Sequence, residues 1–333
     1  MKHLSKSIHL LLITLLMALL SGCDDENITT LQGATQQGRI SIAITDAPLD
    51  EAEELWVRVT GIELKPQNSE KLEFIFCNRH LIEINEDCLN QTTLELDLMK
   101  LTGKTSRALV EGRSIPAQQY NWIRLMLDDD NPGYIKLTGE GDNEYPLTIP
   151  SGAQTGLKIN TQLTVPEGDD LRLTIDFDLR KSLHTTGVGE EMKYILRPAL
   201  RLVDNSNISH LSGTIDHTWL APEYCSPAIY LSEYSPPAES NPPVFIEITD
   251  DLHPENNALI TTTYPVLNNE TGNYEYEIGF IPKGSYVVAF TCNAINDTLE
   301  ENETNIAFFP QKIIEIAAGE EIEVNFNFVR LEL

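Results

Sequence analysis

Apolar and polar side chains partly alternate in Leu55-Trp56-Val57-Arg58-Val59-Thr60. Because neighbouring side chains of a strand point to opposite faces, this pattern predicts a β-strand with one buried and one solvent-facing side. Similar short runs, rich in β-branched residues, span residues 39–45, 55–64, 71–76, 120–127, 171–177 and 194–202. No long stretch has the apolar period of a helix, and we expect only short helices near residues 49–54, 94–101 and 106–110.

A polar, turn-rich stretch, Asp204-Asn205-Ser206-Asn207, separates these strands from a second series. The second series covers residues 211–215, 244–248, 259–264, 274–280, 286–291, 312–316 and 321–328. A proline-rich insertion at residues 235–243 cannot pair inside a sheet, so we expect an exposed loop there. The sequence therefore predicts an all-β protein with two β-sandwich domains in tandem, over residues 38–204 and 209–333.

The N-terminus has the features of a bacterial lipoprotein signal. Lys2 and Lys6 precede an apolar run over residues 8–20, which ends in Leu20-Ser21-Gly22-Cys23. The run is too short to span a bilayer and matches the core of a signal peptide. We expect residues 1–22 to be removed and Cys23 to carry acyl chains, which would anchor the mature chain to a membrane of the cell envelope.

The segment behind the expected anchor is polar. Residues 23–37 lack apolar periodicity, so we expect a flexible tether. Asp24, directly after Cys23, resembles the inner-membrane retention signal of enteric bacteria. The outer membrane or the cell surface stays open as an alternative, and with it the choice between a periplasmic and a surface face.

The chain is strongly acidic, with 51 Asp and Glu against 23 Lys and Arg and a net charge of −28. Phosphate binding needs clustered Lys and Arg, so we expect no nucleic-acid partner. After Asn205, 20 acidic residues are accompanied only by Lys283, Lys312 and Arg330. This excess favours solubility, and attraction for cations such as calcium is the alternative.

Besides Cys23 the chain has four cysteines, an even number that suits an oxidising compartment. We expect disulfides between Cys77 and Cys88 and between Cys225 and Cys292. A zinc site is the rival hypothesis, but the closely spaced cysteine pairs of such sites are absent from the sequence.

Asp176 and Asp178 are candidate cation ligands. They flank Phe177, so on a strand both carboxylates share one face. Pairing with Arg124, Arg197 or backbone donors is the simpler interpretation, and a calcium ion is the alternative.

Asp128 and Asp130 form a second acidic candidate. They belong to a run that ends in Asn131-Pro132-Gly133. The run fails the EF-hand spacing, so we expect a solvated turn between strands, with a calcium site as the alternative.

The sequence contains no catalytic signature. Gly103-Lys104-Thr105 resembles the end of a phosphate-binding loop, but Leu98 occupies the position of the first Gly. No Ser or Cys lies in a nucleophile-elbow pattern, and the histidines lack metal-binding spacing. We therefore expect no enzyme and no cofactor other than calcium.

Several motifs occur in the order of a bacterial family. They are Ile42-Ala43-Ile44-Thr45-Asp46-Ala47-Pro48, Leu55-Trp56-Val57, Thr60-Gly61-Ile62-Glu63-Leu64, Ile115-Pro116-Ala117, Asp176-Phe177-Asp178 and Tyr194-Ile195-Leu196-Arg197-Pro198. Through them, residues 38–204 resemble the domain of unknown function 4382 family, although Gln118 stands where the family commonly has Gly. The resemblance implies an extracytoplasmic, often lipid-anchored β-domain with no established activity.

The second half is similar, more loosely, to carboxypeptidase-regulatory-like and transthyretin-like sandwiches. The matching pieces are Gly213-Thr214-Ile215, Thr271-Gly272-Asn273-Tyr274 and Ile281-Pro282-Lys283-Gly284-Ser285-Tyr286. Such domains act as spacers or binding modules and are often grouped with carbohydrate-binding folds.

Together these features predict a lipid-anchored envelope protein without catalytic activity, which binds a glycan or an envelope protein or has a structural role. In this interpretation the loops of the second domain contact the partner, and the lipid contacts the membrane. The alternatives are a calcium-stabilised structural protein and, third, a hydrolase with a carboxylate-based site.

Overall fold

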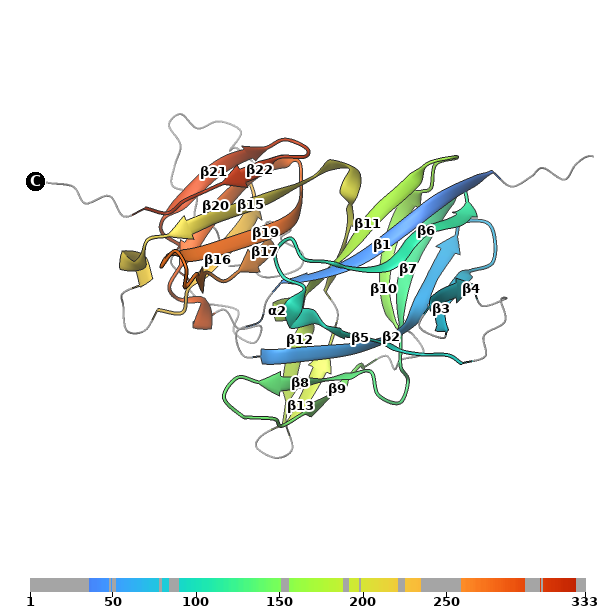
Figure 1. Ribbon diagram of the computed structural model, residues 1–333, viewed down its shortest axis with the longest axis horizontal. Coiled ribbons are helices and arrows are strands. Elements are labelled where there is room, and N and C mark those ends of the chain that lie inside the picture. Colours follow the sequence, from blue (N-terminus) through green and yellow to red (C-terminus); the bar gives the residue numbers. More distant parts are fainter. Residues whose placement is uncertain are drawn as a thin grey trace, which may run out of the picture. The chain divides into compact units, whose positions relative to one another are not determined.

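The computed structural model describes residues 36–47, 49, 52–77, 80–83, 90–150, 156–187, 192–197, 199–220, 225–234, 259–296, 306 and 308–327. Strands in four sheets dominate these residues, which confirms the all-β class (Figure 1). The helices described are single turns: η1 (Leu98–Lys100), α2 (Leu179–Ser182), η4 (Asn205–Asn207), η5 (His217–Leu220) and η6 (Ala294–Asn296). None of these is long and apolar enough to cross a membrane.

The first sandwich contains a four-stranded sheet in the order β14-β11-β1-β6. Its strands are β1 (Gln37–Ala47), β6 (Arg107–Pro116), β11 (Asp170–Asp178) and β14 (Leu200–Asp204). The central strand β1 pairs in parallel with β11 and antiparallel with β6 (Figure 1). Ile40, Ile42 and Ile44 alternate along β1 and are fully buried, as expected for a strand with one face on a core.

The opposing sheet is built around β2 (Ala52–Pro66), which contains the alternating stretch. The sheet has the order β10-β7-β2-β8-β9-β13-β12, with β3 and β5 also paired to β2 and β4 paired to β3. Its other strands are β3 (Leu72–Cys77), β4 (His80–Glu83), β5 (Leu94–Asp97), β7 (Gln119–Leu127), β8 (Gly133–Leu137), β9 (Tyr145–Thr148), β10 (Leu157–Thr164), β12 (Leu183–Thr186) and β13 (Lys193–Leu196). Leu55, Val57 and Val59 of β2 are buried in the core, whereas the side chains between them lie on the outer face.

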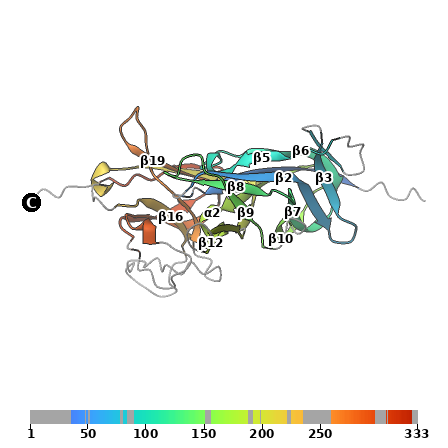
Figure 2. The ribbon, with the colours of Figure 1, turned by 90° about the horizontal axis from the view of Figure 1, so that it is seen from below.

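β2 changes partners along its length. Its first half pairs with β8 and β5, and its second half pairs with β7 and β3 (Figure 2). The register with β7 shifts between Val59 and Gly61, where a Cβ atom on Gly61 would lie 2.2 Å from the carbonyl oxygen of Phe74. Only glycine fits this close approach. The pairing of β2 with β5 and with β7 ends near Thr60. Residues 90–93, which precede β5, and residues 128–132, which follow β7, lie outside the named strands on opposite sides of β2.

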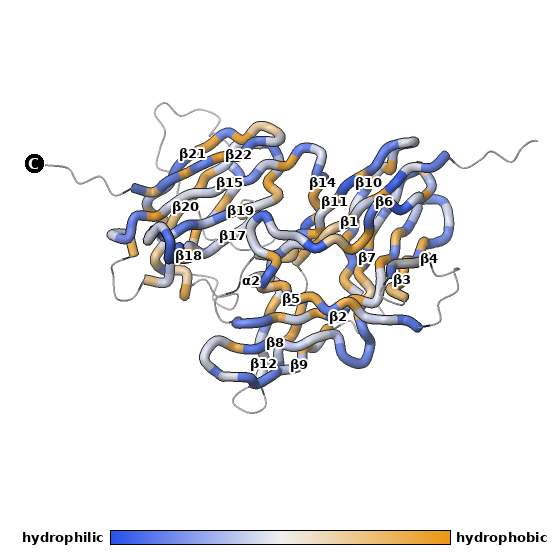
Figure 3. Tube along the Cα trace, viewed as in Figure 1, coloured by the Kyte–Doolittle hydropathy of each residue, from blue (hydrophilic) through white to orange (hydrophobic). Residues whose placement is uncertain are grey.

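The second sandwich consists of two four-stranded sheets, β18-β19-β15-β22 and β17-β16-β20-β21. The strands are β15 (Ile208–Ile215), β16 (Ala228–Glu233), β17 (Leu259–Thr263), β18 (Val266–Leu267), β19 (Tyr274–Pro282), β20 (Gly284–Thr291), β21 (Gln311–Ile316) and β22 (Glu321–Glu323). Its core is separate from that of the first sandwich and includes Leu211, Ile229 and Phe290. In both sandwiches the hydrophobic positions follow the strands (Figure 3).

The structure confirms one expected disulfide. Cys225, before β16, is bonded to Cys292, which directly follows β20. Cys77 is also disulfide-bonded. The predicted partner Cys88 lies outside the described residues, as do the expected signal peptide and Cys23.

Some predictions of local structure are wrong. Residues 52–54 and 107–110 were expected in short helices but belong to β2 and β6, because pairing within the sheets overrides weak local preference. Residues 94–101 form β5 followed by the turn η1. Residues 194–202, expected as one strand, form parts of β13 and β14, which belong to opposite sheets. The predicted strand at 244–248 and the proline-rich insertion lie outside the described residues.

Candidate functional site

Asp176 forms an ion pair on the first sheet. Its Oδ2 atom accepts hydrogen bonds from Nε and Nη2 of Arg201 at 3.0 and 2.5 Å, and the two residues face each other across β11 and β14. The ion-pair interpretation thus holds for Asp176, but its partner is neither Arg124 nor Arg197. Arg124 belongs to β7 in the other sheet, and Arg197 follows the end of β13. Asp178 lies at the end of β11, where its backbone carbonyl accepts a hydrogen bond from Ser182 Oγ at 2.5 Å.

Asp128 and Asp130 lie in the turn between β7 and β8, as the sequence predicts. Asp128 Oδ1 accepts hydrogen bonds from the backbone N–H groups of Asp130 and Asn131, both at 3.1 Å. This arrangement is an Asx turn. The turn closes at Gly133, where φ is 150° and a Cβ atom would lie 2.0 Å from the carbonyl oxygen of Trp56.

The structure does not bring these two aspartate pairs together. The pair in the turn belongs to one sheet of the first sandwich, and Asp176 and Asp178 belong to the other. Within the described ranges, no three His, Cys, Asp or Glu residues are placed to hold a metal ion. Calcium binding therefore stays a prediction without a site in this part of the chain.

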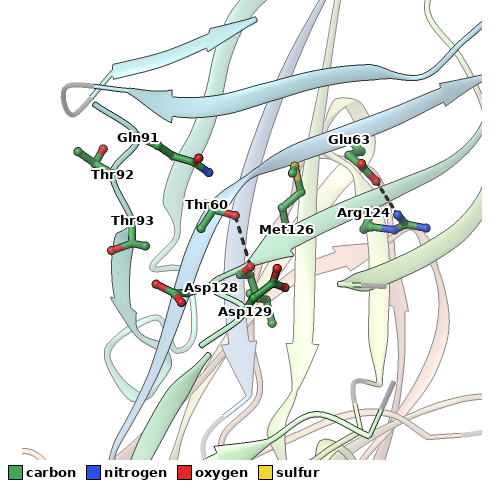
Figure 4. Close-up of a pocket in the computed structure, with 10 residues that line it drawn as sticks. Thr60, Glu63, Gln91, Thr92, Thr93, Arg124, Met126, Asp128 and Asp129 are labelled. Carbon is green, nitrogen blue, oxygen red and sulfur yellow. Dashed lines mark hydrogen bonds and ion pairs between the residues drawn. The ribbon is translucent and has the colours of Figure 1, made fainter. Parts of the chain in front are cut away.

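A cavity of about 430 Å³ lies on the outer face of the larger sheet, where β2 changes partners; we call it the β2 cavity. Its lining comes from β2, from the end of β7 and its turn, and from the segment before β5 (Figure 4). The residues are Thr60, Glu63, Gln91, Thr92, Thr93, Arg124, Met126, Leu127, Asp128 and Asp129.

Glu63 is the fixed charge of the β2 cavity. It is only 3% exposed and receives hydrogen bonds from Arg124 Nη1 at 2.7 Å and from Lys71 Nζ at 2.5 Å, on different carboxylate oxygens. Burial acts to raise the pKa of Glu63, but the hydrogen bond from Lys71 and the charge of Arg124 outweigh it, so the pKa lies below its usual value. Glu63 is therefore ionised near neutral pH, and its position is set by two cations.

An aromatic ring lies next to this ion pair. The guanidinium carbon of Arg124 is 4.7 Å from the centre of the Trp122 ring, and Lys158 Nζ is 5.1 Å from it. Trp122, Arg124 and Met126 alternate with buried residues of β7, so all three lie on the outer face of the sheet. Such cation–π contacts restrict the guanidinium to one orientation.

The wall opposite β7 is polar. Figure 4 shows Gln91, Thr92 and Thr93 across the cavity from Thr60 and Asp128. The backbone N–H of Thr92 donates to the carbonyl oxygen of Phe76 at 2.9 Å, and Gln91 forms a bridge to Cys77. This wall is thereby held by the end of β3.

The sequence alone did not indicate this site. Glu63 and Arg124 each lie between two apolar residues of a predicted strand, which gave them the appearance of ordinary outward-facing positions. The one feature of the sequence that could have indicated the site is that a charged residue interrupts each of these apolar runs. Since they are 61 residues apart, only the pairing of β2 with β7 shows that they meet.

Comparisons with known proteins support the family resemblance. Residues 37–198 match the model of the family described as "Domain of unknown function (DUF4382)". No curated protein matches the chain.

Several solved structures match weakly. The Bacillus anthracis TIE protein is 10% identical, with a TM-score of 0.18, over 87% of this chain and 33% of its own length. The shaft pilin SpaA from Lactobacillus rhamnosus GG is 10% identical, with a TM-score of 0.19, over 89% and 99% of the two chains. A minor pilin of Streptococcus agalactiae is 9% identical, with a TM-score of 0.16, over 86% and 94%. The chain thus spans about a third of the TIE protein.

Proposed function

We propose that this chain, whose residues 37–198 belong to the DUF4382 family, is a lipid-anchored envelope protein that binds a polyhydroxylated ligand such as a glycan in the β2 cavity. The observation that carries the proposal is the Glu63–Arg124 ion pair, held beside Trp122 in a cavity with polar walls. The ligand is bound and released unchanged.

The lining suits a ligand with many hydroxyl groups. Such a ligand needs donors and acceptors side by side, which the guanidinium, carboxylate, amide and threonine side chains of the cavity provide. Arg124 donates to Glu63 through Nη1, while its buried Nε–H has no hydrogen-bond partner among the described residues. The half-buried Trp122 ring adds an apolar surface beside these polar groups.

The same geometry argues against hydrolysis at this cavity. A general acid must hold a proton near neutral pH, and the pKa of Glu63 is shifted in the opposite direction. Both Glu63 oxygens already accept hydrogen bonds from cations, and Asp128 Oδ1 is bound by two backbone N–H groups. Glu63 and Asp128 therefore hold the site in shape.

The anchor part of the proposal is supported by the lipoprotein signal that ends at Cys23. A tether over residues 23–37 places the binding domain within reach of one membrane. The relevant ligands are then glycans of the cell's own envelope or of its surroundings.

The test is a glycan array probed with the purified mature chain, followed by calorimetric titration of the strongest binder. Arg124→Gln removes the guanidinium and is expected to weaken binding at least about tenfold, the size expected for one lost charged hydrogen bond. Arg172→Gln is the matched control, because Arg172 is 71% exposed on β11 and lies in the opposite sheet. Thr93→Val tests the opposite wall without touching the ion pair.

The proposal fails if no glycan is retained by the wild-type chain. It also fails if Arg124→Gln and Thr93→Val bind as tightly as Arg172→Gln.

A further inference from the structure

Three cations lie around Trp122 on the outer face of the larger sheet, next to the β2 cavity. Lys65 of β2 lies directly opposite Trp122 of β7, and Lys158 of β10 lies directly opposite Arg124 of β7. Side chains that are directly opposite on antiparallel strands point to the same side of the sheet. Since Trp122 and Arg124 lie on the outer face, Lys65 and Lys158 lie there too. We call Lys65, Arg124 and Lys158 the cationic patch.

Two carboxylates of this face are already matched by cations. Arg124 and Lys71 both donate to Glu63, and Lys71 also pairs with Glu73. Glu73 lies directly opposite Glu63 on β3, so both carboxylates share the outer face. Two cations thus balance two carboxylates, and this group adds no net charge to the face.

The other two members of the cationic patch have no such match. Within the part of the chain that the structure describes, neither Lys65 nor Lys158 forms an ion pair. The Lys65 ammonium donates to the carbonyl oxygen of Ser69 at 2.8 Å, a neutral partner. The chain as a whole has a net charge of −28, so this local excess of positive charge runs against its composition.

Trp122 places the Lys158 charge beside the β2 cavity. Lys158 Nζ is 5.1 Å from the centre of the Trp122 ring, and the guanidinium carbon of Arg124 is 4.7 Å from the same centre. Arg124 lines the cavity, and Lys158 is its cross-strand neighbour. A cation held against an aromatic ring loses part of its freedom, so this exposed ammonium stays next to the cavity.

The acidic residues of the site lie at its other end. Asp128 and Asp129 line the β2 cavity in the turn that follows β7. A strand rises about 3.3 Å per residue, so Arg124 and Asp128 are roughly 13 Å apart along the chain direction. A negatively charged group of a ligand is therefore attracted to the Trp122 end and repelled from the turn.

We propose that the glycan bound by this chain is acidic. A sugar unit with a carboxylate or a sulfate ester places this group at Lys158, and the following units extend past Arg124 into the β2 cavity. This inference rests on the proposed function, because it assigns the class of glycan and its direction within the same site. An ammonium is a point charge that accepts either anionic group.

The test is a glycan array that pairs anionic glycans with neutral counterparts. Oligogalacturonate, oligoalginate and hyaluronan fragments are each printed beside their carboxyl-reduced form, and dextran sulfate beside dextran. We expect the purified mature chain to bind at least one anionic glycan about threefold or more tighter than its neutral partner, the effect of one exposed ion pair. The carboxylate and sulfate arms show which anionic group is recognised.

Lys158→Gln should remove this preference, and Lys158→Arg should keep it, since only the first change removes the charge. Lys193→Gln is the matched control. Lys193 is an exposed lysine of β13 in the same sheet, three strands away from β7, and should leave the preference unchanged. All three side chains are exposed, so the folded state should tolerate these changes.

The outcomes separate the two proposals. If a neutral glycan binds as tightly as its anionic partner, or if Lys158→Gln keeps the preference, the acidic class is wrong and glycan binding stands. If the only glycans retained are neutral ones, the acidic class is wrong as well. If no glycan of either kind is retained, the proposed function fails and this inference fails with it.

Discussion

The two sandwiches use their acidic residues in different ways. In the first, several carboxylates with little exposure pair with a cation, as in Glu63 with Arg124 and Asp176 with Arg201. In the second, the described residues form one ion pair with each other, between the sequence neighbours Asp216 and His217. An excess of acidic residues does not by itself fix the positions of their carboxylates. A carboxylate that is paired with cations has a fixed position, and a ligand can contact it there.

The sandwiches also differ in how they are stabilised. The largest expected change in the free energy of unfolding comes from removing the disulfide of the second sandwich. Cys225 and Cys292 are 67 residues apart, so their disulfide removes much freedom from the unfolded second sandwich. Replacing both with Ser should lower the free energy of unfolding by about 2–5 kcal/mol. Denaturant unfolding followed by tryptophan fluorescence measures it.

Glycan binding at the β2 cavity is the control, because it should survive the loss of this disulfide under native conditions. A doubly substituted chain as stable as the wild type would contradict the prediction and would show that sheet packing alone holds the second sandwich.

A smaller effect is expected when the central carboxylate of the first sandwich is neutralised. Glu63→Gln leaves Arg124 without its carboxylate partner, whereas Lys71 keeps its ion pair with Glu73. The change should cost about 2 kcal/mol, below the range for fully buried pairs because both cations are partly exposed. Glu95→Gln, at a carboxylate that is 53% exposed, should cost less than about 1 kcal/mol. Urea unfolding of the two variants measures the difference.

The Glu63 effect should depend on pH in a known direction. Because the folded-state pKa of Glu63 is lowered, its stabilisation is present above the unfolded-state pKa and is lost as the pH falls through the folded-state pKa. The stability gap between wild type and Glu63→Gln should therefore shrink in acid. A gap that stays constant from neutral pH to strong acid would contradict the ion-pair explanation.

The smallest expected effect concerns calcium. Asp176 is bound by Arg201 and Asp128 by backbone N–H groups, so we expect no saturable change in melting temperature between added calcium and added chelator. Differential scanning fluorimetry of the mature chain measures it. A saturable rise in melting temperature with calcium would show that acidic side chains bind the ion. The contrast drawn between the two sandwiches would then be wrong.

The alternation around Val57 was enough to predict β2 and, with the other short runs, the all-β class. It was not enough to predict the register shift next to Gly61, since that shift depends on how β2 pairs with its neighbouring strands, which the sequence does not show. The same limit explains the wrong partners predicted for Asp176: its neighbour Arg201 became available only because the chain divides into β13 and β14 after Leu196. Local patterns thus indicated the strands, whereas the site required knowledge of their pairing.

The central position of β1 has a consequence for how the chain folds. The Ser41 hydroxyl donates to Asp170 at 3.1 Å across 129 residues of sequence, and β1 pairs with β11 in parallel from Arg39 to Ala47. Pairs so distant in sequence close late, because the entropy of the intervening loop must be lost first. During synthesis, the earliest strand of the sheet therefore waits for one of the last. Until β11 is made, the edge of β1 opposite β6 has no strand to pair with, and unpaired edges of this kind are prone to aggregation.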